Sequence, residues 1–341
     1  MTSSTGSWTA SELPVIGAPM AGGATRPALV AAVASAGGFG FLAGGYKTPE
    51  ALEAEMAALT VPFGVNLFVP GPSTLTEAEF RRYAEELADE GTPYGLELAG
   101  APMVADDDDR WQGKLDLLLD RPVPFVSFTF GLPGSDVVRA LADVGTQVLA
   151  TVTTLGEAQA AVELGVHGLI AQGTEAGGHS GTHAPERPGA VPVVELVRQV
   201  AAGTSLPVIA AGGVSEASQV RELLGFGASA VAVGTVLLRT DESGASAVHK
   251  DALAAAGPDQ TVITRAFTGR PARGLRNGFI ERHEASAPIG YPAIHHLTRP
   301  LRAAAAAAGQ PDQVHLWAGT GYSRARTGPA AAVITELASE L

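Results

Sequence analysis

The feature that most constrains the fold of this chain is a repeated alternation of short apolar runs with amphipathic segments. The runs are rich in Val, Ile, Phe and Leu, which is typical of strands buried on both faces of a parallel sheet. Eight such runs are present, at residues 14–20, 38–43, 63–68, 124–130, 147–152, 168–173, 207–213 and 230–235. We therefore predict eight buried parallel strands.

Amphipathic segments with helical spacing separate these runs. Several begin at a residue that commonly caps helices, such as Thr154 before the segment 155–164 and Ser215 at the start of the segment 215–224. We predict helices at residues 26–36, 48–59, 76–90, 135–143, 155–164, 191–202 and 215–224, with a closing helix at 329–341. This alternation predicts an α/β fold of the (β/α)8 type, a TIM barrel. An open doubly wound sheet is the alternative architecture.

Two stretches do not fit the repeat. Residues 91–121 contain the acidic run Asp106–Asp109, which we interpret as a solvated surface segment, because four adjacent carboxylates do not converge on a metal. Residues 241–310 show helical patterns at 245–256 and 301–308. We expect residues 1–240 and 311–341 to form the barrel, and 241–310 to be a mostly helical insertion packed by the barrel mouth.

Composition excludes several function classes. The chain has no cysteine, which rules out disulfides, thiolate zinc sites, iron–sulfur clusters and thiol catalysis. Its net charge of −13 argues against binding to nucleic acid or to an anionic membrane. The first ten residues lack the features of a signal peptide, and no apolar run is long enough to span a membrane. We expect a cytoplasmic protein, and leave a homo-oligomer open.

In a barrel of this kind the active site lies at the carboxyl ends of the strands. Glycines there let backbone N–H groups approach an anion, and a following helix N-terminus favours negative charge. Such residues follow the sixth, seventh and eighth strands: Gly177, Gly178, Gly212, Gly213, Gly234 and Thr235. They predict a phosphate site.

Polar side chains at other strand ends indicate further chemistry. The amides of Asn66 and Gln172 offer both a donor and an acceptor, which suits the edge of a heterocycle such as a flavin, although they could simply anchor loops. His179 follows the sixth strand and is our candidate base, because histidine exchanges protons near neutral pH. His183 is a rival. We predict no metal site, because the two histidines lack an HExxH pattern.

The remaining histidines and the usual nucleotide motifs point to no second site. We interpret His249, His295 and His296 as structural, because they do not follow predicted strands. The chain has no GxSxG elbow, no P-loop and no GxGxxG motif opening a first βα unit. A Rossmann domain for NAD is therefore not supported.

Six segments carry a family resemblance: AQGTEAGGH at residues 171–179, VSFTFGLP at residues 126–133, and residues 16–46, 207–214, 227–243 and 266–277. They resemble the nitronate monooxygenase family, formerly grouped as 2-nitropropane dioxygenases. The similarity covers nearly the whole chain and is strongest at residues 171–179.

The resemblance implies a (β/α)8 barrel that holds FMN noncovalently. It implies oxidative denitrification, in which a nitronate or nitroalkane and O2 give a carbonyl compound and nitrite. His179 would remove the α-proton of a neutral nitroalkane, or position an anionic nitronate. The implied contacts are Pro19, Met20, Ala21 and Asn66 at the flavin ring, Gln172 at its polar edge or ribityl chain, Gly178, Gly213, Gly234 and Thr235 at the phosphate, and Met20, Phe130 and Tyr291 as substrate walls.

Two positions depart from the family pattern. Thr320 replaces a glutamine in the segment 317–321, and Ser180 stands where many relatives carry a basic residue. An NAD(P)H-dependent flavin reductase of quinones or enoyl thioesters is an alternative function, and a non-catalytic flavin-binding module is another. A barrel like that of IMP dehydrogenase is excluded, because that chemistry needs a cysteine.

Overall fold

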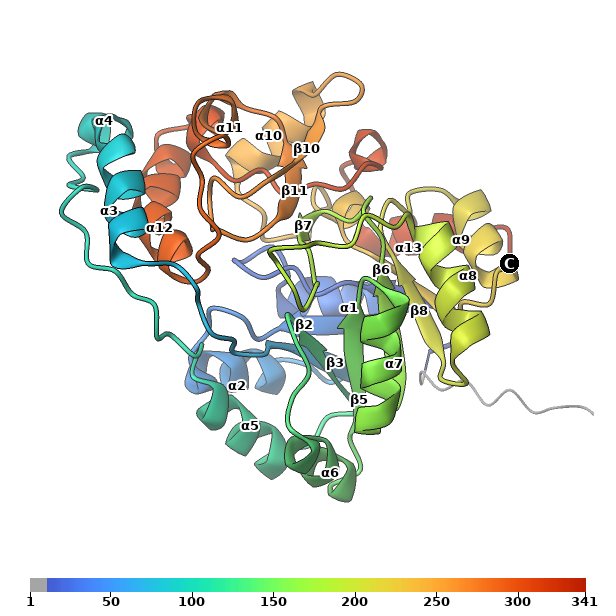
Figure 1. Ribbon diagram of the computed structural model, residues 1–341. Helices are drawn as coiled ribbons and strands as arrows, with labels where there is room; N and C mark the ends of the chain where they lie inside the picture. Colours follow the sequence, from blue (N-terminus) through green and yellow to red (C-terminus); the bar gives the residue numbers. More distant parts are fainter. Residues whose placement is uncertain (1–10) are drawn as a thin grey trace, which may run out of the picture.

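A computed structural model describes residues 11–341 of the chain. Within them, eight parallel strands close into a barrel in the order β1-β2-β3-β4-β5-β6-β8-β9, with β9 paired to β1 (Figure 1). The strands are β1 Val15–Gly17, β2 Phe39–Ala43, β3 Phe63–Phe68, β4 Phe125–Thr129, β5 Gln147–Val152, β6 Gly168–Gln172, β8 Val208–Ala211 and β9 Ala230–Val233. Each lies within a predicted apolar run, so the TIM barrel is confirmed. The first ten residues, for which we predict no signal peptide, lie outside the described residues.

The barrel interior is filled by large side chains rather than open. Along each strand, successive side chains point alternately into this interior and toward the surrounding helices, as the two-residue period of a strand requires. Phe39 contacts Phe41 and Phe125 edge to face, with ring centroids 5.4 and 5.3 Å apart. Ile16 and Ile209 belong to the same buried cluster. These side chains form a packed layer inside the barrel.

Helices cover the outside of the barrel (Figure 1). They are α1 Pro27–Ser35, α2 Pro49–Ala57, α5 Trp111–Asp120, α6 Ser135–Asp143, α7 Leu155–Leu164, α8 Val193–Gly203, α9 Ala217–Gly225 and α13 Ala330–Leu337. Thr154 caps α7 as predicted, whereas α9 is capped by Glu216 instead of Ser215. Helix α5 was not predicted, because its apolar face follows directly on the acidic run.

A second layer of structure lies over the carboxyl ends of the strands. Its elements are α10 Ala247–Ala255, α11 Gly278–His283, α12 Ala293–Ala307, and the antiparallel strands β10 Thr261–Thr264, β11 Ala272–Leu275 and β7 Gly178–His179. The short strands were not predicted from the sequence. Helices α3 Glu77–Glu86 and α4 Ala88–Gly91 join this layer, since Phe80 and Tyr83 pack in one cluster with Phe279 and Leu297. Single 3-10 turns lie at Thr92–Tyr94, Thr235–Leu237, Pro311–Gln313 and Tyr322–Arg324.

The acidic run is only partly solvated. Asp106, Asp107 and Asp108 are exposed, but Asp109 pairs with the buried Lys114 at 2.7 Å. Asp107 Oδ2 lies 2.8 Å from His296 Nε2 of α12. The run therefore ties the barrel periphery to the upper layer. In residues 11–341 no group of three or more His, Asp or Glu side chains is arranged to hold a metal ion.

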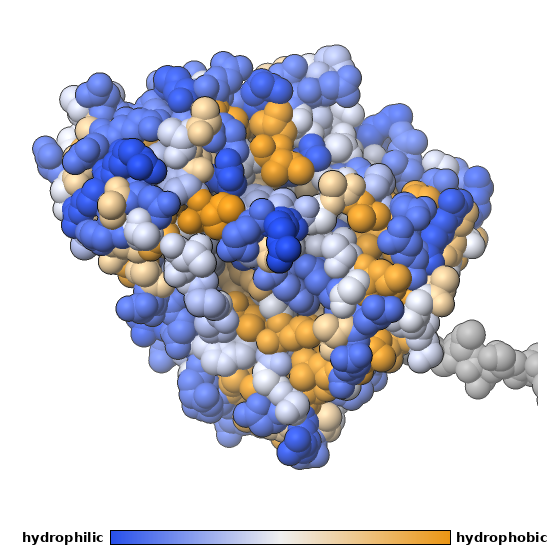
Figure 2. Space-filling model, viewed as in Figure 1, coloured by the Kyte–Doolittle hydropathy of each residue, from blue (hydrophilic) through white to orange (hydrophobic). Residues whose placement is uncertain are grey.

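The surface in this view is mostly hydrophilic, with hydrophobic residues in several separate patches (Figure 2). None of the helices described for residues 11–341 combines the length and the apolar character that crossing a bilayer requires.

Candidate active site

A cavity of about 660 Å³ lies between the barrel and the upper layer. That volume is in the range of sites for small molecules and cofactors. Its floor includes Ile16, Phe41 and Ile209 of the barrel interior, and α12 and residues 314–317 contribute the opposite wall. Of the residues predicted for the site, those that line this one cavity are Pro19, Met20, Ala21, Asn66, Phe130, Gln172, Gly177, Gly178, His179, Gly212, Gly213, Gly234 and Thr235. Tyr291, expected as a substrate wall, is not part of the lining.

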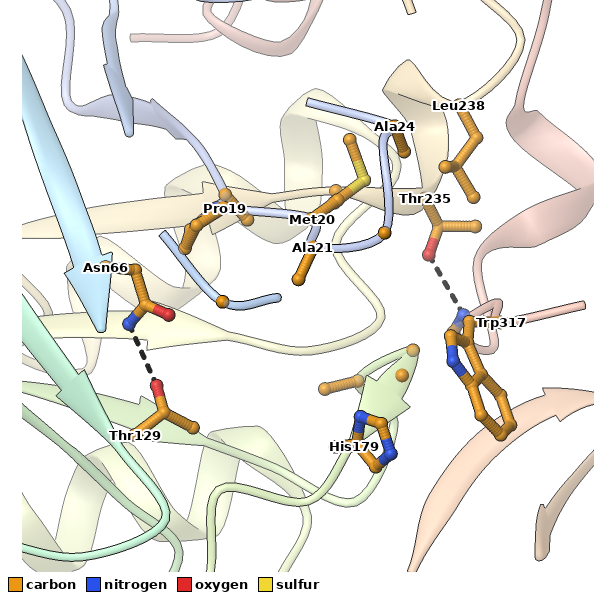
Figure 3. A pocket seen from close by; sticks show the side chains of 18 of the residues that line it. Pro19, Met20, Ala21, Ala24, Asn66, Thr129, His179, Thr235, Leu238 and Trp317 are labelled. Carbon is orange, nitrogen blue, oxygen red and sulfur yellow. Dashed lines mark hydrogen bonds between the residues drawn. The ribbon is translucent and has the colours of Figure 1, made fainter. Parts of the chain in front are cut away.

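The loop after β1 forms one side of the cavity. Pro19, Met20 and Ala21 lie along this side, and His179 lies across the cavity from them (Figure 3). Thr25 fixes the loop, because its Oγ1 accepts a hydrogen bond of 2.8 Å from the backbone N–H of Met20. The loop is therefore shaped before any ligand is present.

Asn66 presents an acceptor to the cavity. Its Nδ2 donates to the carbonyl oxygen of Ser127 at 3.2 Å, to Ser127 Oγ at 3.0 Å and to Thr129 Oγ1 at 2.9 Å (Figure 3). The Ser127 carbonyl can only accept, so these bonds fix which end of the amide carries the nitrogen. Oδ1 forms no hydrogen bond with any described residue, which leaves it for a donor on a ligand.

Glycine backbone builds the far end of the cavity. Gly178, Gly212 and Gly213 have φ angles of 77°, 129° and 71°, which side chains rarely allow. A Cβ on Gly177 would lie 2.4 Å from the backbone N of Gly319, and that same N–H donates to Thr235 Oγ1 at 2.9 Å. The loop after β6 therefore meets the segment 317–321 through close backbone contact, and the loop after β9 meets it through the Thr235 hydroxyl.

Gln172 supports the loop that carries His179. Its Nε2 donates to the carbonyl oxygen of His179 at 3.1 Å, and its Oε1 accepts from the N–H of Gly181 at 2.6 Å. Both ends of the amide therefore contact loop backbone, although the side chain also lines the cavity.

His179 is held over the barrel mouth by strand pairing. Its backbone pairs with Ala272 of β11, and the N–H of Ser180 donates to the carbonyl of Pro271 at 2.8 Å. The ring lies among three aromatic rings, those of Phe130, Tyr291 and Trp317, at centroid distances of 5.7, 5.9 and 5.5 Å. Burial, together with the charges of Arg270 and Arg302, lowers the pKa of His179 to about 3. The imidazole is therefore neutral at pH 7.

His183, the rival candidate, has a structural place. Its Nε2 lies 3.1 Å from the carbonyl of Thr151, and its N–H donates to Glu157 Oε1 at 2.8 Å. It does not line the cavity. The Glu157 carboxylate also accepts from the Thr182 hydroxyl at 3.0 Å, which fastens this loop to the barrel.

Phe130 is a strained position in the cavity wall. Its φ of 81° is uncommon for a residue with a Cβ, and such positions cluster at functional sites. The guanidinium carbon of Arg270 lies 3.9 Å from the centre of its ring. Tyr291 contacts the same ring at 5.5 Å.

The sequence did not predict one wall of the cavity, which holds the cation Arg302 and three histidines. His249, His295 and His315 line the cavity together with Arg302, whereas the sequence suggested that the first two are structural. No Asp or Glu among the described residues lines it. Arg302 is buried and lies on α12, outside any strand end. Tyr46, which stacks on His295 with ring centroids 4.3 Å apart, also lines the cavity.

The two departures from the family pattern lie outside the lining. Thr320 is exposed, and its N–H donates to the backbone carbonyl of Glu175 at 3.0 Å. Any residue except proline could supply that contact. Ser180 is tied to Pro271 through its backbone, and its carbonyl accepts from Arg270 Nε at 3.2 Å.

The residues present fit a flavin nucleotide. The cavity volume is adequate, the free Asn66 oxygen suits a ring N–H, and the glycine backbone around Gly213 has the open conformation that an approaching phosphate requires. The absence of carboxylates from the described lining suits an anionic cofactor and an anionic substrate.

A family model described as "Nitronate monooxygenase" matches residues 7–340. A protein of Bacillus subtilis (strain 168), described as a probable nitronate monooxygenase, is 36% identical over 316 residues, which covers 90% of each chain. A protein of the same description from Staphylococcus aureus (strain MSSA476) is 33% identical and covers 97% of this chain and 94% of its own.

Two solved structures illustrate the structural likeness. Nitroalkane oxidase from Streptomyces ansochromogenes superimposes with a TM-score of 0.90 and 44% identity, covering 97% of this chain and 96% of that one. FabK from Thermotoga maritima superimposes with a TM-score of 0.74 and 25% identity, covering 97% and 93%. The likeness to the nitroalkane oxidase is therefore closer in both sequence and backbone.

Proposed function

Because the chain belongs to the nitronate monooxygenase family of flavin-dependent oxidoreductases, we propose that it catalyses FMN-dependent oxidative denitrification. In this reaction a nitronate or nitroalkane and O2 give a carbonyl compound and nitrite. The observation that carries the proposal is the neutral His179 imidazole, placed opposite the loop of Pro19, Met20 and Ala21 in a cavity whose described lining has no carboxylate.

We assign the flavin to the side of the cavity next to the barrel. Pro19, Met20, Ala21 and Asn66 would contact the ring, with the Asn66 oxygen as the acceptor. The phosphate would lie at the glycine backbone of the far end, at Gly177, Gly178, Gly212, Gly213, Gly234 and Thr235. The Gln172 amide already bonds to the His179 loop through both its nitrogen and its oxygen. It would contact the flavin through its second N–H or through the second lone pair of its oxygen. A bound flavin supplies the electron transfer and the reaction with O2.

The protein's own residues supply a base and a favourable field. A nitro group acidifies the adjacent carbon, so a neutral imidazole at His179 can accept the α-proton of a nitroalkane. The positive charges of Arg270 and Arg302 would stabilise the resulting nitronate, which is an anion. Met20 and Phe130 would pack against the alkyl part of the substrate. Residues 241–310 would act as an insertion that covers the cavity and limits its contact with water.

The test starts from the purified protein with its flavin released and identified by chromatography against FMN and FAD. The loaded protein is then mixed without oxygen, in separate experiments, with ethylnitronate and with NADH while the visible flavin absorbance is followed. We expect ethylnitronate to lower the absorbance and nitrite to be released once air is admitted. Loss of absorbance with NADH alone would instead support a reductase. Bound flavin without a response to either compound would support a binding module.

A further inference from the structure

The side chain of His179 has one hydrogen-bond partner among the described residues, and that partner is a buried threonine. Nε2 of His179 lies 2.9 Å from Oγ1 of Thr268, a residue of the turn that precedes β11. Thr268 is 1% exposed. The same hydroxyl lies 3.3 Å from the carbonyl oxygen of Arg270 and is placed to donate to it. Thr268 therefore stands between the ring and a backbone acceptor.

The number of protons available for these two hydrogen bonds determines the tautomer of the His179 ring. A threonine hydroxyl has one proton to donate, and a carbonyl oxygen can only accept. Both contacts of Thr268 form together only when its proton points to Arg270 and His179 donates from Nε2–H. The opposite tautomer would break the bond to the Arg270 carbonyl, and it would also place a proton on Nδ1, where no described residue accepts it.

In this tautomer Nδ1 of His179 is unprotonated, and it is the ring nitrogen left free toward the cavity. Nδ1 of His179 forms no hydrogen bond with any described residue, and the ring lines the cavity. Packing against Phe130, Tyr291 and Trp317 prevents the ring from turning to another partner. Nδ1 is thus the atom left for a substrate.

We propose that Thr268 is a positioning residue for the base: it holds His179 as the Nε2–H tautomer, so that Nδ1 is the atom that takes the substrate's proton. The inference rests on the proposed function. In the step, the α-C–H bond of a neutral nitroalkane breaks, its electron pair moves into the nitro group to give the nitronate, and the proton forms an Nδ1–H bond. The imidazolium keeps its Nε2–H bond to Thr268, which remains able to accept it.

The kinetic test uses two substrates that differ only in the proton. Neutral nitroethane needs a base, whereas ethylnitronate has already lost the proton. In the FMN-loaded protein, Thr268→Val should lower kcat/KM for nitroethane about tenfold or more, because a base contributes far more than that to proton transfer. The loss for ethylnitronate should be clearly smaller. Thr268→Ser keeps the hydroxyl and should restore most of the nitroethane activity.

A matched control separates this effect from general damage. Thr146 is equally buried, and its hydroxyl donates to the Val123 carbonyl at 2.8 Å, but it does not line the cavity. Thr146→Val makes the same chemical change and should leave the ratio of the two activities unchanged. Equal losses for both substrates in Thr268→Val, or no rescue by serine, would overturn the proposal.

A second measurement needs no variant and no turnover. Nitrogen-15 NMR of histidine-labelled protein distinguishes a protonated ring nitrogen from a bare one. The wild-type protein should show His179 with a protonated Nε2 and a bare Nδ1, assigned by loss of the signals in His179→Asn. A bare Nε2 would contradict the proposal even if the protein oxidises nitronates. If wild type oxidised neither compound, the proposed function would fail while the tautomer could still be determined.

Discussion

Nη2 of Arg302 lies 3.2 Å from Nδ1 of His295 and 3.0 Å from the carbonyl oxygen of the same residue. Nε of Arg302 donates to Thr298 Oγ1 at 3.1 Å, so three bonds fix the guanidinium on α12. No described carboxylate pairs with it, and Nη1 forms no hydrogen bond with any described residue. A buried and unpaired cation in a cavity wall is costly unless an anion approaches it.

The first prediction concerns this cation. Arg302→Met should raise the KM of ethylnitronate about tenfold, because a hydrogen bond to a charged group contributes about 1.5–3 kcal/mol. Arg326→Met is the control, since Arg326 is exposed and pairs with Glu336 away from the cavity. Steady-state kinetics would measure both variants. An unchanged KM in Arg302→Met would show that the substrate anion binds elsewhere.

The second prediction concerns the pH dependence of catalysis. The acid limb of kcat/KM reports the pKa of the base in the free enzyme. Because the pKa of His179 is lowered to about 3, its imidazole stays neutral well below pH 6. The kcat/KM for freshly dissolved neutral nitroethane should therefore show no loss as pH falls from 7 to 5. A decline centred near 6.5, the value of an unperturbed histidine, would contradict this environment for His179.

The third prediction concerns acid stability. Burial and the charge of Arg302 hold the pKa values of His295 and His315 well below 6.5. Between the folded and unfolded pKa values the unfolded chain binds more protons, so the free energy of unfolding rises with pH and falls on acidification. Between its folded and unfolded pKa values, each histidine contributes a slope of at most about 1.4 kcal/mol per pH unit. Denaturant unfolding at pH 7 and pH 5 should show the loss, and equal stability at both would refute it.

The fourth prediction concerns the close backbone contact at the far end of the cavity. Gly177→Ala would place a methyl group 2.4 Å from the Gly319 backbone nitrogen, so the two loops must separate. The dissociation constant of FMN, measured by fluorescence titration of the flavin-free protein, should rise at least about tenfold. Gly156→Ala on α7 would place its Cβ 4.0 Å from Thr154 Oγ1, an ordinary contact, and should bind FMN as the wild type does. Equal affinities in the two variants would argue against a phosphate at this backbone.

The sequence predicted the barrel well, because each strand is a continuous apolar run bounded by turns. Once the strands were predicted, the glycines and His179 that follow them could be predicted to share one cavity, because a barrel brings the carboxyl ends of its strands together. The strands β7, β10 and β11 escaped prediction because they are short and pair only through long-range contacts. Pairing of β7 with β11 is nevertheless what fixes His179 and brings Thr268 to it.

The wall of the cavity that contains Arg302 and His315 could not be predicted from the positions of the strand ends. Arg302 and His315 lie far from any barrel strand in sequence, and their place in the site depends on how α12 packs over the mouth. The acidic run has three exposed residues, as expected, but its contacts with Lys114 and His296 are long-range and leave no local sequence pattern. Gln172 was correctly placed at the cavity, yet its bonds to the His179 loop depend on a loop conformation that spacing does not specify.

His179 is the base in the oxidative denitrification that we propose. The most direct test compares nitrite release under air by wild type and His179→Asn, each loaded with FMN, with neutral nitroethane and with ethylnitronate. Wild type should release nitrite from both compounds, whereas His179→Asn should lose about a hundredfold or more of the rate with nitroethane and retain turnover of ethylnitronate. Undiminished nitroethane oxidation by His179→Asn, or no nitrite from wild type with either compound, would contradict the claim.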